Sequence, residues 1–161
     1  MPVEHEGNSQ GCEEEACKIE ELVAELLGCQ VWDAEKREPR NLTLEDVLIV
    51  APFNMQVRLL KKRLGTKARI GSVDKFQGQE AHVVIVSMCS STLDDSPRGA
   101  EFLLEPNRLN VAVSRAKSLA IITGNPNLIA ARCRTIRDME LANLFCWLVE
   151  YAQGQTASCS S

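Results

Sequence analysis

The chain has 161 residues, of which 45% are hydrophobic and 25% charged, a composition typical of one globular domain. A formal net charge of −4 argues against indiscriminate nucleic-acid binding, and no apolar run approaches the roughly 18 residues of a membrane span. The acidic amino terminus does not fit a secretory signal, so we predict a cytoplasmic protein. The 7 cysteines are odd in number and form no C-x-x-C pair, which favours reduced thiols over disulfides or a metal site.

The first half of the chain predicts two helices around one strand. Apolar residues recur at helical spacing over residues 13–27. Residues 33–46 are polar and contain a proline, which predicts a loop. Residues 47–51 are all apolar, as in a strand covered on both faces, and a helix from Pro52 to residue 64 should follow.

The second half predicts further strands and helices, with a polar loop over 90–106. We expect strands at 69–73, 82–88 and 118–123, a helix from about 107, and helical segments near 126–131 and 137–151. Alternating apolar strands and helices predict an α/β fold over residues 1–152, a parallel sheet with helices on both faces. The small polar residues 153–161 predict a disordered tail. In such sheets ligands collect at the carboxyl ends of the strands, here the turns at 51–54, 74–80 and 123–126.

Charge is unevenly distributed along the chain. No acidic residue lies between Asp46 and Asp74, a stretch that holds six cations: Arg58, Lys61, Lys62, Arg63, Lys67 and Arg69. This segregation fits either a solvated helix face or one edge of a groove that tracks phosphates.

Two further segments carry polar chemistry. Residues 107–117 place Arg108 and Arg115 seven residues apart, and guanidinium groups suit phosphate oxygens. Residues 72–80 crowd polar side chains around Gly78, either as a ligand-binding loop or as a plain tight turn.

Three segments together resemble superfamily 1 helicases of the Upf1/Dna2-like group. SVDKFQGQE (72–80) looks like their motif V, and RLNVAVSRAK (108–117) is similar to their motif VI. APFNMQ (51–56) resembles the segment that opens the groove of the second motor domain. The loop 96–103 and the opening residues 4–16 look closest to the subset fused to RecB-like nucleases.

The resemblance implies a RecA-like (P-loop NTPase-type) second motor domain with a divided site. Arg115 would be the arginine finger that reaches the γ-phosphate of ATP. The residues expected at the nucleotide, or supporting the finger, are Gln77, Gly78, Glu80, Arg108 and Asn110. The residues expected toward the nucleic-acid strand are Pro52, Phe53, Gln56 and Ser72.

The chain has no G-x-x-x-x-G-K-[ST] loop and no Asp-Glu pair for Mg²⁺. By the resemblance these lie on a first RecA-like motor domain, which we expect to precede residue 1 and to hold ATP with Mg²⁺. The sequence therefore predicts the second motor domain of an ATP-dependent DNA helicase or helicase–nuclease of DNA repair, inactive as an ATPase alone. Its partners would be the first motor domain and single-stranded DNA or RNA, and no membrane. The alternative is a non-catalytic nucleic-acid-binding or partner-docking module. A small α/β enzyme is disfavoured because no paired base and nucleophile is visible.

Overall fold

The core of the molecule is a four-stranded parallel sheet. The computed structural model describes residues 1–33, 36–94, 96, 98–130 and 133–158. In spatial order the strands are β4 (Arg69–Gly71), β3 (Val47–Val50), β5 (Ala81–Ser87) and β6 (Ala116–Thr123). All pairings are parallel, which confirms the predicted sheet.

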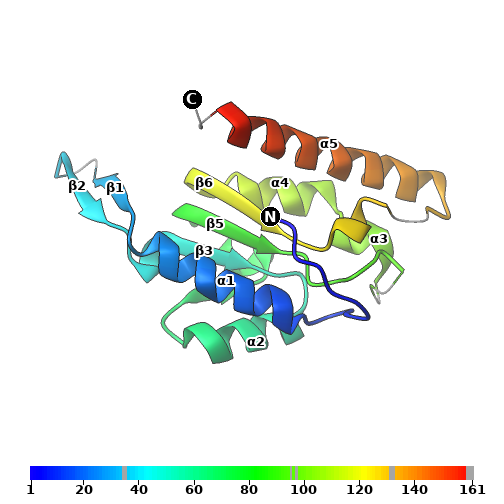
Figure 1. The fold of residues 1–161 in the computed structure, drawn as a ribbon, viewed down its shortest axis with the longest axis horizontal. Coiled ribbons are helices and arrows are strands. Elements are labelled where there is room, and N and C mark those ends of the chain that lie inside the picture. The colour runs from blue at the N-terminus through cyan, green and yellow to red at the C-terminus, as the bar shows by residue number, and fades with distance from the viewer. Residues whose placement is uncertain (34–35, 95, 97, 131–132, 159–161) are drawn as a thin grey trace.

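Helices cover both faces of this sheet, as predicted (Figure 1). On one face lie α1 (Glu13–Leu26) and α2 (Asn54–Leu64). On the other lie α3 (Gly99–Leu103), α4 (Pro106–Val113) and α5 (Ile136–Ser158). The two layers explain why all of β3 is buried, since its residues alternate between two apolar clusters.

Short 3-10 turns replace parts of the predicted strands and helices. The strand expected at 69–73 ends at Gly71, and η2 (Val73–Phe76) follows directly. A Cβ atom at Gly71 would lie 2.7 Å from Lys75 Cδ, so η2 turns back closely over the end of β4. Of the helical segment predicted near 126–131, the described residues 126–130 form only η3 (Pro126–Leu128), and residue 131 lies outside the described residues. η1 (Leu44–Asp46) precedes β3.

The loop predicted over 33–46 was partly wrong. β1 (Gln30–Asp33) and β2 (Glu38–Asn41) form an antiparallel pair that projects beside the main sheet (Figure 1). Its anchor is Arg40, whose guanidinium donates two hydrogen bonds of 2.6 Å to the Asp46 carboxylate. These bonds, and those donated by Thr43, hold the pKa of Asp46 well below its usual range.

The end of the chain is more regular than its composition predicts. α5 runs to Ser158, so residues 153–158 of the predicted disordered tail are helical, and 159–161 lie outside the described residues. Extending an existing helix costs less than starting one, which lets weak helix formers join it. In the described part of the chain, no helix is both long enough and apolar enough to span a bilayer.

Candidate phosphate-binding site

A groove of about 540 Å³ opens at the carboxyl ends of β3, β4 and β5. Pro52 and Phe53 reach it because α2 begins only at Asn54, later than predicted, which leaves both residues extended after β3. Ser72 reaches it from the turn after β4. The structure thus brings Pro52, Phe53 and Ser72, three of the four residues predicted to face a nucleic-acid strand, to one groove.

The opposite wall of the groove consists of arginines around an aromatic ring. The guanidinium carbons of Arg98 and Arg108 lie 4.6 Å and 4.4 Å from the centre of the Phe102 ring. Phe102 in turn lies 5.4 Å from Phe53, centre to centre. Within the described part of the chain, neither guanidinium forms a hydrogen bond or an ion pair. The wall is therefore a cationic surface on an aromatic support.

A second, smaller hollow of about 230 Å³ lies between η2 and α4, and Arg108 and Asp74 border both spaces. Arg115 and Gln77 line this second hollow. The predicted helix ends at Val113, so Arg115 lies beyond it at the start of β6.

Backbone hydrogen bonds hold Arg115 in place. Its N–H donates to Ala112 O (3.2 Å), and its carbonyl accepts from Ala81 N–H (3.0 Å). Its Nε is buried and has no hydrogen-bond partner among the described residues. A buried donor without an acceptor is costly, which suits an arginine that meets an anionic oxygen supplied from outside.

The remaining predicted nucleotide residues do not line either hollow. Glu80 lies at the amino end of β5, where its carboxylate is 3.4 Å from Lys117 Nζ and exposed. Gly78 adopts a φ of +77°, so glycine is required there by the turn itself. Asn110 is exposed on α4. Of the residues predicted at the nucleotide, Gln77, Arg108 and Arg115 therefore line the second hollow, and Gly78, Glu80 and Asn110 do not.

Gln56 does not reach the groove, contrary to the role predicted for it. Its side chain is fully buried and donates to Ser87 Oγ (3.0 Å) and Cys12 O (3.3 Å). Its Oε1 accepts from Cys12 N–H (2.8 Å). Gln56 thus connects the start of α1 to the sheet, and its amide is not available to a nucleic-acid strand.

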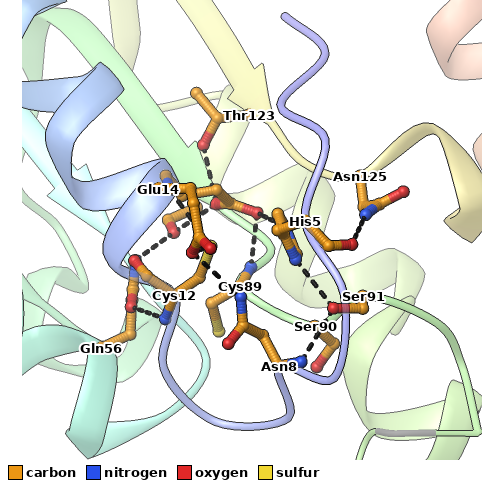
Figure 2. A network of polar contacts seen from close by, with 12 residues as sticks. His5, Asn8, Cys12, Glu14, Gln56, Cys89, Ser90, Ser91, Thr123 and Asn125 are labelled. Atoms are coloured by element: carbon orange, nitrogen blue, oxygen red, sulfur yellow. Dashed lines mark hydrogen bonds and ion pairs between the residues drawn. The ribbon is translucent and has the colours of Figure 1, made fainter.

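A buried polar network surrounds Glu15 in the same region, and Figure 2 shows its labelled partners His5, Cys89 and Thr123. The carboxylate has no exposed surface and accepts from Ser87 Oγ (2.7 Å), Cys89 N–H (3.0 Å) and Thr123 Oγ1 (3.1 Å). His5 Nε2 lies 3.2 Å from Glu15 Oε1. Sequence reasoning missed Glu15, although it stands four residues before Ile19 on the buried face of α1.

His5, Cys12 and Glu15 also place possible metal-ligand atoms within 4.8 Å of one another. Each of these atoms already has a protein partner: His5 Nδ1 lies 2.8 Å from Ser91 Oγ, and Cys12 Sγ accepts from Glu15 N–H. Burial raises the pKa of the Cys12 thiol to about 12, which disfavours the thiolate that a metal needs. We therefore assign the polar network a structural role rather than a metal-binding one.

Comparison with known proteins places this geometry in a family context. A family model described as "AAA domain" matches residues 2–127. Over 98 residues the chain is 40% identical to "Probable RNA helicase armi" of Drosophila melanogaster, covering 56% of this chain and 8% of that protein. It is 37% identical over 91 residues to "DNA polymerase alpha-associated DNA helicase A" of Schizosaccharomyces pombe, a match that covers 55% of this chain and 13% of that protein. It is 45% identical over 71 residues to "Regulator of nonsense transcripts 1 homolog" of Drosophila melanogaster, a match that covers 44% of this chain and 6% of that protein. The chain thus spans only a small part of each relative.

Proposed function

Because this chain belongs to the AAA domain family and resembles proteins named as helicases, we propose that it is the second motor domain of an ATP-driven helicase. In this role it supplies Arg115 to ATP bound on a first motor domain, and part of the groove for a single strand. The structural requirement is a cation fixed on a rigid element and free of internal partners.

Arg115 is the observation that carries the proposal. Its backbone is hydrogen-bonded to α4 and to the first residue of β5, and its buried Nε has no acceptor among the residues that the structure describes. An arginine positioned in this way can stabilise the charge that develops on a transferring phosphoryl group without reorganising. Gln77 borders the same hollow and offers an amide donor and acceptor.

The residues around Arg115 fit phosphate oxygens better than a metal ion. Asp74 is the one carboxylate among the described residues that line the hollow, whereas Mg²⁺ in such sites needs several oxygen ligands. We therefore propose that Mg²⁺ is held by the first motor domain, and that this chain contributes positive charge. When bound, ATP would supply the free energy released by transfer of its γ-phosphoryl group to water.

The proposed strand path is the groove at the carboxyl edge of the sheet, bordered by Pro52, Phe53 and Ser72. The relatives named above include one named as an RNA helicase and one named as a DNA helicase, so both strand types must be tested. We propose that the chain belongs to the nuclease-fused subset, because the loop 96–103 and the opening residues 4–16 resemble that subset. We propose single-stranded DNA as its first substrate.

The experiment is an ATPase assay with single-stranded DNA and RNA on the longest natural form of the gene product, comparing wild type with Arg115→Ala. We expect the variant to lose roughly a thousandfold or more of its turnover, since arginine fingers contribute on that scale. Strand binding, measured in parallel, should stay near wild type.

Arg137→Ala is the matched control, since Arg137 is an exposed arginine on α5 that pairs with Glu140. Near-normal turnover in Arg115→Ala would remove the basis of the assignment. In that case the non-catalytic binding module becomes the better account, because the cationic wall beside Phe102 can bind phosphates without ATP chemistry.

A further inference from the structure

We propose that Arg98 is a phosphate contact for the single strand, acting with Arg108 across the Phe102 ring. This inference rests on the proposed function, since it names a strand-binding residue in the same groove. Arg98 lies outside segments 51–56, 72–80 and 108–117. It falls within the loop 96–103 that resembles the nuclease-fused subset, and that resemblance assigns it no role.

The geometry fixes both arginines on one support. Arg98 is the residue that precedes α3, Phe102 lies within α3, and Arg108 lies in the first turn of α4. Cation–π attraction holds each guanidinium within 4.6 Å of the ring centre. Two like charges gathered at one ring repel each other, and an anion bound between or beside them relieves that repulsion.

No carboxylate among the described residues neutralises this pair. The chain carries more acidic than basic residues, 22 against 18, and Arg40, Arg63, Arg134 and Arg137 each pair with a carboxylate. Arg63, for example, donates to both Glu13 and Glu20. In the part of the chain that the structure describes, Arg98 and Arg108 make no such pair, so their charge is available to a ligand.

The groove favours a strand over a free nucleotide. Single-strand sites combine cations that follow the backbone with aromatic and apolar walls for the bases. Phe53, Pro52 and Phe102 supply such walls here. Asp74 also borders the groove, and its negative charge repels phosphate. This repulsion directs the sugar-phosphate backbone of the nucleic acid to the side that Arg98 occupies.

The test is fluorescence anisotropy of the 161-residue chain with labelled oligothymidylate and oligouridylate at several salt concentrations. Arg98→Gln should weaken binding roughly three- to tenfold, between the effects of an exposed ion pair and a charge-assisted hydrogen bond. It should also lower the slope of log affinity against log salt by about 0.7, the value for one phosphate contact on a single strand. Arg98→Lys should keep that slope while losing part of the affinity, because it keeps the charge but not the fork.

Arg137→Gln is the matched control, with the same charge change outside the groove, and circular dichroism checks that all variants fold. Equal affinities and slopes for Arg98→Gln and Arg137→Gln would overturn the inference, and so would a wild-type chain that binds neither oligonucleotide.

Competition with excess ATP is a second experiment. If ATP displaces the strand from wild type but not from Arg98→Gln, then Arg98 binds a nucleotide phosphate and the inference is wrong. None of these outcomes alters the ATPase result for Arg115, so the proposed function stands or falls separately.

Discussion

Glu15 shows how one buried carboxylate can organise the amino-terminal segment. It accepts hydrogen bonds from the ends of two strands, through Ser87 of β5 and Thr123 of β6, and from the loop after β5 at Cys89. It also meets His5, whose backbone carbonyl accepts from the Asn125 side chain. A charge with no exposed surface is tolerated only when its oxygens are satisfied in this way.

Glu15→Gln should therefore destabilise the fold by about 2–4 kcal/mol, because an amide N–H₂ would replace an acceptor where donors already converge. Urea unfolding followed by circular dichroism measures the change. Glu25→Gln, on the exposed side of the same helix, is the control and should stay within about 0.5 kcal/mol of wild type. Equal midpoints for the two variants would show that the network contributes little.

At the scale of elements, α5 packs against α3. Leu141 on α5 is 1% exposed and joins the same apolar cluster as Leu103 of α3. Leu144, one turn further on, is 45% exposed. The support for Phe102 and its two arginines therefore depends on the buried face of α5.

We expect Leu141→Ala to lower the free energy of unfolding by about 2–4 kcal/mol, as for other buried leucines, and Leu144→Ala to change it by less than about 0.5 kcal/mol. Thermal and urea unfolding give both values. A comparable loss in the two variants would contradict the docking of α5 through Leu141.

The sequence predicted some elements well and others poorly, for reasons visible in particular residues. β3 was found because a strand covered on both faces is apolar throughout, whereas the β1–β2 pair is mostly exposed and contains Pro39. Arg108 and Arg115 were grouped correctly by residue type, yet only the structure shows that Arg115 lies beyond the helix. Gln56 was misplaced because no local pattern reveals that an amide in the first turn of α2 bonds back to Cys12.

At the scale of the whole molecule, the two hollows lie on either side of Arg108 and share η2 as a wall. Val73 and Asp74 of η2 border both the groove and the space beside Arg115. A shift of η2 caused by one ligand would therefore change the walls that meet the other. This shared wall offers a physical route by which ATP and a strand could influence each other, provided that a second domain closes over Arg115.

The isolated chain should consequently show no ATP hydrolysis with or without single-stranded nucleic acid, while the longest natural form hydrolyses ATP and is stimulated by a strand. The reason is that the chain offers Arg115 but no P-loop to hold the phosphates that Arg115 would act on. A phosphate-release assay on both forms, at matched concentrations, measures the difference, and Arg115→Ala in the long form gives the background from contaminating ATPases. Turnover by the isolated chain above that background would mean that its own residues bind and activate ATP, and the division of the site between two domains would be wrong.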